Sequence, residues 1–444
     1  MLFNNIKKGF ELFSSKKDLI NNFSWALAGK SANLLSGLLV GIIVARFLGP
    51  SSYGLMNYVI SYVTLFSIIS NFGLDSIEIR ELSIAKSDEE KKILIITSFY
   101  LRLLLSVLAF LLIFFTVLII ESDKYTITMV MAYSTTLFFT SFNVIRNYYT
   151  STLSNKHIVK NEFVRLAIGA IIKGLLILNN CSLTWFILAT ILDYILIASG
   201  YLVAFKEYIK IKDLTKYNLN IAKQLIIYSY PLVISGAAII IYERLDQIVI
   251  RKFLGDTELG LFSISSKLTE VMLFVPLILV QSYIPLLAKN YKEDIENYKY
   301  KRQYLINAII WLSIFLALLL SISSHILVPI LFGERYNGAI SILQVLAWKS
   351  VFTSLFFVSG QIIIIENLQK YAFLRNICGC IVSVMLNFIL IPKLGIIGSA
   401  WAAVLTFAVT GYFSHLLIRP YRFLFNMQSI GLFWGFKKIK NIIQ

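Results

Sequence analysis

The feature that most constrains the fold of this chain is a series of long apolar runs. One of them, "LLLSVLAFLLIFFTVLII" at residues 103–120, approaches the roughly 20 apolar residues that cross about 30 Å of hydrocarbon. Hydrophobic residues make up 58% of the 444 residues and charged residues only 15%, whereas soluble domains average about 25% charged residues. The chain is therefore expected to be a polytopic membrane protein rather than a soluble one.

Twelve segments have the length and apolar character of membrane spans. They are expected to be helices, because lipid cannot satisfy open backbone groups and no run alternates as a barrel strand does. The first run is too long for a signal peptide and lacks a small-residue cleavage site, so it is expected to be retained. The predicted spans lie at 23–46, 54–79, 93–120, 126–146, 161–178, 183–205, 225–249, 261–287, 305–331, 340–365, 372–391 and 395–418.

Basic residues are distributed unevenly between the two sides of these spans. The N-terminus, alternate loops and the C-terminal tail hold 28 of the 41 lysines and arginines, including Lys370 and Arg375, while the opposite loops hold 5. Since cytoplasmic loops are enriched in basic residues, both termini are predicted to be cytoplasmic. The same rule accounts for the net charge of +17, so no nucleic-acid partner is expected.

A short polar turn occurs twice. "ARFLGPSSYGLM" at 45–56 and "RKFLGDTELGLF" at 251–262 align at a constant offset of 206 residues, with an even number of spans between them. This predicts a parallel duplication. At this offset Phe47, Leu48, Gly49, Gly54 and Leu55 match Phe253, Leu254, Gly255, Gly260 and Leu261.

The duplication predicts two six-span lobes, at 23–205 and 225–418, joined by a lysine-rich cytoplasmic linker at 206–224. Outside the lobes, residues 1–22 and 419–444 combine apolar and basic residues. Such segments are typical of helices that lie in the membrane interface, so both are predicted to be cytoplasmic and interfacial.

Ionisable residues within the spans are the candidates for function, because a charge at membrane depth costs about 2.5–3.5 kcal/mol. A lysine or arginine near a span end can instead reach the headgroups, and Lys267 and Glu270 could equally form an internal ion pair. The candidates for binding an anionic substrate are Lys30, Arg102, Arg165, Lys173, Arg244, Lys267 and Lys349. The candidates for ion coupling are Asp75, Asp193, Asp246 and Glu270, although carboxylates near span ends could instead pair with Arg80 or a similar cation.

Several other classes of site are disfavoured. The Gly-Lys-Ser of "ALAGKSAN" lacks the first glycine and the preceding strand of a phosphate-binding loop. Three cysteines and three histidines are scattered along the chain, so no disulfide framework, metal site or cofactor is expected. The loops opposite the cytoplasm are too short to fold as a catalytic domain. An enzyme is therefore not expected, and an ion gradient is the expected energy source.

Five stretches resemble one membrane-protein family. They are "NNFSWALAGKSANLLSGLLVGIIVARFLGPSSYG", "NFGLDSIEIRELS", "ERLDQIVIRKFLGDTELGLFSISSKL", "LFGERYNGA" and "IPKLGIIGSAWAAV". Their order and spacing over nearly the whole chain resemble the polysaccharide exporter branch of the multidrug/oligosaccharidyl-lipid/polysaccharide exporter superfamily. Within that branch, the chain looks like the Wzx-type flippases of O-antigen or capsule repeat units.

The resemblance implies two six-helix lobes around a central cationic cavity in the bacterial inner membrane. It implies movement of an undecaprenyl-diphosphate-linked oligosaccharide from the cytoplasmic to the periplasmic leaflet, in O-antigen (lipopolysaccharide) or capsule synthesis. The implied partners are this polyprenyl-diphosphate-linked oligosaccharide, a coupling ion (proton or sodium), membrane lipid and other polysaccharide-assembly proteins. Three alternatives remain open: a lipid II flippase, a drug/cation antiporter of the same superfamily, and a membrane-embedded polysaccharide polymerase.

Overall fold

The structure is a computed structural model that describes residues 2–206, 208, 213 and 215–435, with side chains from Ser24 onward except at residues 26, 27 and 434. Every regular element within this part of the chain is a helix, which confirms the all-α class. The predicted interfacial tail beyond residue 435, the middle of the predicted linker, and the predicted apolar face of residues 1–22 lie outside the described residues or side chains.

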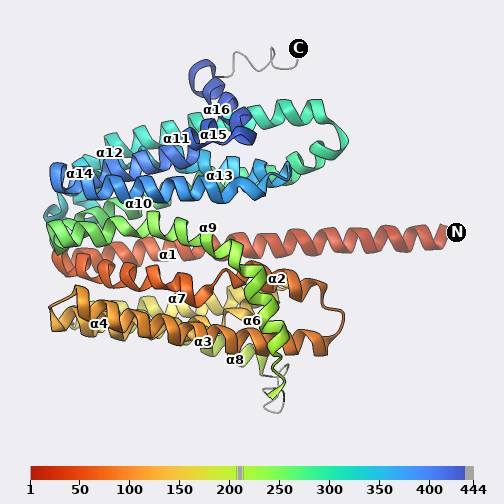
Figure 1. The fold of residues 1–444 in the computed structure, drawn as a ribbon, viewed down its shortest axis with the longest axis horizontal. Coiled ribbons are helices and arrows are strands. Elements are labelled where there is room, and N and C mark those ends of the chain that lie inside the picture. The colour runs from red at the N-terminus through yellow and green to blue at the C-terminus, as the bar shows by residue number, and fades with distance from the viewer. Residues whose placement is uncertain (1, 207, 209–212, 214, 436–444) are drawn as a thin grey trace. The chain divides into compact units, whose positions relative to one another are not determined.

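The chain divides into two compact units. The first comprises Met1–Val44 and Phe66–Val233, and its central helices lie side by side in Figure 1. Helices α1 and α9 each continue into the second unit. The elements of the first unit are α1 (Leu2–Asn71), α2 (Leu74–Ile84), α3 (Asp88–Ile120), α4 (Lys124–Ser134), α5 (Thr136–Thr140), α6 (Asn143–Ser151), α7 (Asn155–Leu178), α8 (Leu183–Phe205) and α9 (Leu219–Leu254).

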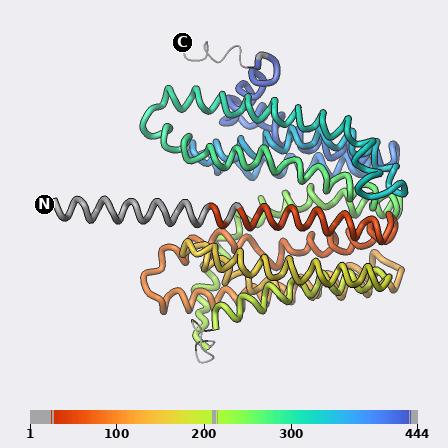
Figure 2. Tube along the Cα trace, turned by 180° about the vertical axis from the view of Figure 1, so that it is seen from behind, coloured from red at the N-terminus to blue at the C-terminus, as the bar shows by residue number. Residues whose placement is uncertain are grey.

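The second unit comprises Ala45–Leu65 and Ile234–Gln444, and its long helices are seen from behind in Figure 2. A buried apolar cluster that includes Ile306, Ile310, Leu355 and Ile362 holds α11 against α13. Its further elements are α10 (Asp256–Glu293), α11 (Ile295–Phe332), η2 (Glu334–Tyr336), α12 (Ala339–Leu346), α13 (Lys349–Ile365), η3 (Gln369–Tyr371), α14 (Ala372–Ala408), η4 (Val409–Phe413), α15 (Ser414–Leu417), η5 (Arg419–Tyr421) and α16 (Arg422–Trp434).

Helix α3 illustrates how the sequence sets both the start and the orientation of a helix. Ser87 and Glu90 form a reciprocal capping box at its first turn, which satisfies backbone donors that a helix start leaves open. Beyond this turn, one face is buried within the first unit. The opposite face carries large exposed apolar side chains at helical spacing, which is the pattern of a lipid-facing surface. These side chains are Leu104, Leu108, Leu111, Phe115 and Ile119.

Eight helical stretches of the described chain are long and apolar enough to cross a membrane. Two of them, 28–84 and 369–417, each cover two predicted spans. The predicted span at 126–146 is divided into the short helices α4, α5 and α6, and α7 carries several charged residues within its apolar stretch. The chain is thus a multi-pass membrane protein by these criteria, and the count of twelve spans stays a prediction.

The two copies of the repeated turn have the same backbone conformation. Gly49 interrupts α1 with φ 75° and ψ 170°, and Gly255 separates α9 from α10 with φ 90° and ψ −179°. Positive φ values combined with extended ψ values are strained for side chains other than glycine. The local geometry therefore requires a glycine at both Gly49 and Gly255.

The two turns also contact each other within the second unit. A Cβ atom added to Gly54 would overlap the carbonyl group of Asp256, and one added to Gly260 would overlap the carbonyl group of Pro50. Asp256, which faces Gly54, corresponds at the offset of 206 residues to Pro50, which faces Gly260. The contact is reciprocal, as it is across a local two-fold axis.

Candidate functional site

The second unit brings together six ionisable side chains from three helices. Helix α9 carries three of them within a single turn, and α10 and α13 supply the rest. Of these, Asp246 is buried, Arg244, Lys267 and Lys349 are half-buried, and the other two are exposed. We call this set the mixed-charge cluster; it consists of Glu243, Arg244, Asp246, Lys267, Glu270 and Lys349.

Lys349 connects the acidic members of the mixed-charge cluster. It interacts electrostatically with both Glu243 and Asp246, and its Nζ atom lies 4.7 Å from the centre of the Phe407 ring. An ammonium group over an aromatic face is attracted by the negative face of the ring. Lys349 is therefore a cation near two carboxylates, and no direct ion pair between Lys349 and either of them is found among the described residues.

Neighbouring polar side chains fix the position of the cluster. Ser61 Oγ donates a hydrogen bond of 2.6 Å to Gln247 Oε1, and the backbone N–H of Gln247 donates to Asp246 Oδ1 at 2.7 Å. Lys267 Nζ lies 3.8 Å from Glu270 Oε2, in the internal ion pair that their three-residue spacing allows. Because Ser61 belongs to α1 and Gln247 to α9, this bond ties both helices to the cluster.

The cluster contains as many acidic as basic groups. The sequence predicts a cavity with an excess of positive charge, yet the three cations on α9, α10 and α13 are accompanied by three carboxylates. A balanced site changes its net charge whenever one carboxylate binds a proton or a metal cation. Five predicted site residues, Arg244, Asp246, Lys267, Glu270 and Lys349, are thus brought together here.

In the first unit, α7 packs its polar stripe against α1 and α8. Arg165 donates a hydrogen bond from Nη2 to Asn33 Oδ1, and Asn33 Nδ2 donates to Glu162 Oε2 at 2.8 Å. Lys173 and Asp193 form an ion pair with 2.6 Å between Nζ and Oδ2. Both predicted cations of α7 therefore have polar partners on neighbouring helices.

Gly169 lies between these two contacts on α7. A Cβ atom at this position would overlap the carboxylate of Asp193, so the glycine allows α8 to bring that carboxylate close to Lys173. Lys30, one turn before Asn33 on α1, is exposed. No ion pair of Lys30 is found within the described part of the chain, which sets it apart from Arg165 and Lys173.

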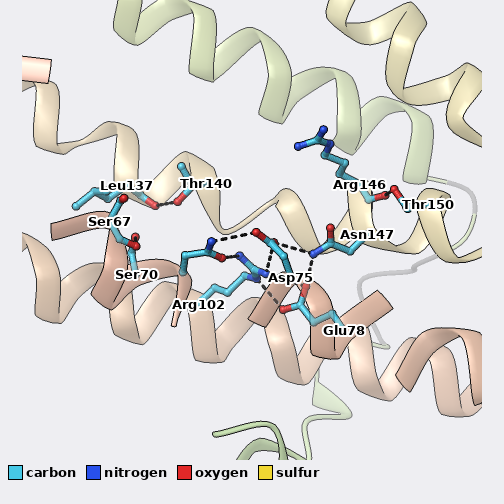
Figure 3. A network of polar contacts seen from close by, with 11 residues as sticks. Ser67, Ser70, Asp75, Glu78, Arg102, Leu137, Thr140, Arg146, Asn147 and Thr150 are labelled. Atoms are coloured by element: carbon cyan, nitrogen blue, oxygen red, sulfur yellow. Dashed lines mark hydrogen bonds and ion pairs between the residues drawn. The ribbon is translucent and has the colours of Figure 1, made fainter. Parts of the chain in front are cut away.

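Arg102 on α3 lies at the centre of a separate buried network (Figure 3). Its Nε and Nη2 atoms donate to the two carboxylate oxygens of Glu78 at 2.7 and 2.9 Å, and Nη2 also donates to Asp75 Oδ1 at 2.8 Å. Asn71 accepts from Nη1 at 3.0 Å, and Asn147 donates to both carboxylates. Two carboxylates thus neutralise one guanidinium, and this arrangement favours a structural role for Arg102 and Asp75.

An apolar pocket of about 460 Å³ lies elsewhere in the first unit, between α3 and the residues that lead into α9. Aliphatic side chains such as Leu101, Leu104 and Leu219 line it together with Tyr100 and Tyr217. The two tyrosine rings meet edge to face with their centres 6.3 Å apart. A lining of this kind suits an alkyl chain rather than a charged group.

The segment beside this pocket is held by a salt bridge. Lys216 Nζ lies 2.6 Å from Glu89 Oε1 and 2.9 Å from Asp213 Oδ1. The hydrogen bonds to Glu89 and Asp213 raise the pKa of Lys216 above its ordinary value. These contacts connect the predicted linker to the first turn of α3.

Sequence reasoning missed several polar residues that the fold places in these networks. Glu162 lies on α7 and Asn147 on α6, and no local sequence pattern links either residue to α1 or α2. Only the tertiary structure reveals their partners. Arg375 was counted among the cytoplasmic basic residues although it falls inside the predicted span 372–391, and the structure places it on α14, where it is buried. The clue was its position directly before the apolar run "NICGCIVSVML".

Comparison with known proteins connects this fold to one family. Residues 19–291, more than half of the chain, match the family described as "Polysaccharide biosynthesis protein". The capsular polysaccharide biosynthesis protein CapF of Staphylococcus aureus is 26% identical over 227 residues, which cover 50% of this chain and 55% of that protein. The probable low-salt glycan biosynthesis flippase Agl15 of Haloferax volcanii is 24% identical over 224 residues, which cover 49% of this chain and 47% of that protein.

The chain spans about half the length of these curated relatives, while a solved structure matches nearly all of it. The lipid II flippase MurJ, in an inward closed conformation, gives a TM-score of 0.66 at 16% identity over 91% of this chain and 90% of that chain. At this identity the likeness concerns the fold. The chain is thus a member of the polysaccharide biosynthesis protein family, with a fold like that of MurJ.

Proposed function

We propose that this protein is a flippase for a lipid-linked oligosaccharide rather than an enzyme. The match of residues 19–291 to the polysaccharide biosynthesis family carries the proposal. It is supported by the printed names of the relatives, which include a capsular polysaccharide biosynthesis protein and a glycan biosynthesis flippase. The proposed substrate is an undecaprenyl-diphosphate-linked repeat unit, carried from the cytoplasmic to the periplasmic leaflet of the bacterial inner membrane.

The chemistry of this substrate defines what the protein must provide. A diphosphate and its sugars do not cross hydrocarbon, whereas a polyprenyl tail stays in it. We place the diphosphate near Arg244, Lys267 and Lys349, because charge-assisted hydrogen bonds from Lys and Arg are the strongest partners for phosphate oxygens. Movement of the two predicted lobes, 23–205 and 225–418, would then alternate the access to this site.

The balanced charges of the cluster suggest how an ion could be coupled to transport. While Asp246 and Glu243 are ionised, they compete with phosphate for Lys349. Binding of a proton or sodium ion by these carboxylates would release Lys349 for the diphosphate. Substrate and coupling ion would therefore favour each other's binding, as linked equilibria require. The same reasoning applies to Asp193, which forms an ion pair with Lys173 in the first unit.

The decisive experiment is complementation of a bacterial strain that lacks its own repeat-unit flippase and has the matching glycosyltransferases. Expression of this chain should restore surface polysaccharide and remove the lipid-linked repeat units that accumulate on the cytoplasmic leaflet. Lys349→Ala should impair this export while leaving the amount of protein in the membrane unchanged. Lys289→Ala is the matched control, because Lys289 is an exposed lysine of α10. Normal export by Lys349→Ala would contradict the assigned role of this lysine.

The three carboxylates of the mixed-charge cluster favour one second candidate, a drug/cation antiporter. An organic cation would use Glu243, Asp246 and Glu270 directly, and the basic residues would then oppose binding. Vesicles containing the purified protein would separate the two candidates. Uptake of a cationic dye driven by an ion gradient, together with no rescue of the flippase-deficient strain, would replace the flippase proposal with this one.

A further inference from the structure

Two arginines are buried among the described residues, Arg102 and Arg375. The Nε and Nη2 atoms of Arg102 donate to the two carboxylate oxygens of Glu78. This is the bidentate geometry that a guanidinium offers to carboxylate or phosphate groups. Arg375, which is 5% exposed, has no carboxylate at all within hydrogen-bonding distance in the described part of the chain. A buried cation without a counter-charge is unfavourable unless an anion joins it.

The contacts that Arg375 does make leave its bidentate edge available. Nη1 donates a hydrogen bond of 3.3 Å to the carbonyl oxygen of Phe356, and the guanidinium lies 3.9 Å from the centre of the Phe356 ring. The Nε atom is buried and has no hydrogen-bond partner among the described residues. The Nη2 atom lies beside Gly360, where an added Cβ atom would be 3.5 Å away.

Two further buried polar side chains near Arg375 also lack partners. A Cβ atom added to Gly379, one turn after Arg375 on α14, would lie 3.5 Å from the Tyr242 ring. His415 is linked through Gln428 to Ser359, the residue before Gly360, and both Tyr242 and His415 are buried. The hydroxyl of Tyr242 and the Nε2 atom of His415 have no hydrogen-bond partner among the described residues. Several unpaired polar atoms around one cation are expected where a ligand or ion completes the site.

The hydrogen bonds of His415 define what its free nitrogen can do. Gln428 uses its Nε2 atom to donate to Ser359 Oγ at 2.7 Å and to the carbonyl of Gly411 at 3.1 Å. Its Oε1 atom, 3.1 Å from His415 Nδ1, is therefore an acceptor. Since Nδ1 carries the proton in this bond, the Nε2 atom of a neutral His415 is an acceptor.

We propose that Arg375, Tyr242 and His415 bind a phosphate group inside the second unit. Arg375 Nε and Nη2 and the Tyr242 hydroxyl donate to phosphate oxygens, and the protonated oxygen of a hydrogen phosphate donates to His415 Nε2. This combination of donors with one acceptor distinguishes hydrogen phosphate from sulfate, which carries no proton at neutral pH. The site borders the mixed-charge cluster, since the Tyr242 ring and Lys349 both contact the Phe407 ring. The proposal does not rest on the proposed function.

The first test measures binding of inorganic phosphate to the purified full chain in detergent, at constant ionic strength, by titration calorimetry. Saturable binding is expected, and sulfate should bind about tenfold more weakly because it leaves the histidine acceptor unpaired. This comparison needs no variant, so it does not depend on whether a substituted protein folds. Absence of saturable phosphate binding would overturn the proposal, unless the lipid phosphate tested below binds instead. Equal affinity for sulfate would refute the role of His415.

Variants then locate the site. Arg375→Gln should abolish phosphate binding, and Arg375→Lys should weaken it about tenfold or more because a lysine cannot present two fixed donors. Arg422→Gln is the matched control, since Arg422 is an exposed arginine of the same unit, and it should bind as the unmodified protein does. Unchanged binding by both Arg375 variants would place the phosphate elsewhere and overturn the proposal.

A final arm distinguishes the two sources of such a phosphate. Polyprenyl monophosphate in detergent micelles replaces inorganic phosphate as the probe. Competition between the two probes would show that the site accepts the phosphate of a lipid. Binding of inorganic phosphate alone would identify the ligand as the free ion. Binding of the lipid alone, lost in Arg375→Gln, would identify a lipid phosphate. Binding of neither probe would overturn the proposal.

Discussion

Arg102 in the first unit and Arg375 in the second are both buried, but their surroundings differ. Arg102 contacts two carboxylates and Asn71, so each of its three guanidinium nitrogen atoms donates a hydrogen bond. Arg375 contacts a single carbonyl oxygen and an aromatic ring. The difference teaches that burial alone does not reveal the role of a membrane arginine. A neutralised guanidinium stabilises the fold, whereas one without a counter-charge is available to an anionic ligand.

The largest effect is expected for Arg102→Met. This change leaves the fully buried Glu78 without its counter-charge, so the free energy of unfolding should fall by about 3–5 kcal/mol. Thermal or denaturant unfolding of the full chain in detergent measures it. Arg80→Met is the control, because Arg80 is exposed and its ion pair within the described part of the chain is with the neighbouring Glu81. A small loss of stability in Arg102→Met would remove the contrast between the two arginines.

A graded effect is expected within the Arg102 network. Glu78 is 0% exposed and Asp75 is 43% exposed, and solvent screens an ion pair of the exposed kind. Glu78→Gln should therefore destabilise the protein by about 2–3 kcal/mol and Asp75→Asn by about 1 kcal/mol. The same unfolding measurement compares the two variants. A larger loss for Asp75→Asn would show that Asp75 is the main counter-ion.

Arg375→Met should have a much smaller effect in phosphate-free buffer. It removes a buried charge that has no described carboxylate partner, so stability should stay within about 1 kcal/mol of the unmodified protein or rise. Added phosphate should then raise the melting temperature of the unmodified protein alone, since a ligand stabilises only the state that binds it. A severe loss of stability in phosphate-free buffer would show that the protein itself compensates Arg375.

The smallest effect concerns the exposed salt bridge of Lys216. Because Glu89 and Asp213 raise its pKa in the folded protein, the stabilisation is fully present below the ordinary lysine value of 10.5 and is lost as the pH rises through the higher folded value. The difference in melting temperature between the unmodified protein and Lys216→Gln should therefore shrink only above about pH 10.5. A difference that shrinks already between pH 7 and 9 would point to another titrating group.

The sequence was sufficient for the all-helical membrane class and for the repeated turn. Apolar runs report membrane spans directly, and a positive φ combined with an extended ψ requires a visible glycine, as at Gly49 and Gly255. The counter-ions were harder to predict. Asp75 and Glu78 could be assigned to Arg80, which is close in sequence, whereas the structure pairs them with Arg102 on the next helix. Partners on different helices are set by packing, which leaves no local sequence pattern.

The position of Arg375 was missed for a related reason. The count of basic residues on each side of the membrane assumes that an arginine near the end of a span is solvated. Arg375 is the fourth residue of α14 and was therefore treated in this way. Helix α13 packs against that end of the helix, where Phe356 and Gly360 lie beside Arg375, and these contacts are not local in sequence. Five residues of the mixed-charge cluster were predicted as candidates and Glu243 was not, and the balance of charge became visible only when α9, α10 and α13 were placed together.

The reciprocal contact of Gly54 and Gly260 bears on the ancestry of the chain. Each copy of the turn presents the same surface to the other, as the subunits of a symmetric dimer do. A half-length forerunner carrying one such turn would already have been self-complementary, so two copies would have paired before their genes fused. After fusion, a bulkier residue at either glycine would meet the backbone of the opposite copy, so each position restricts how far the other can diverge.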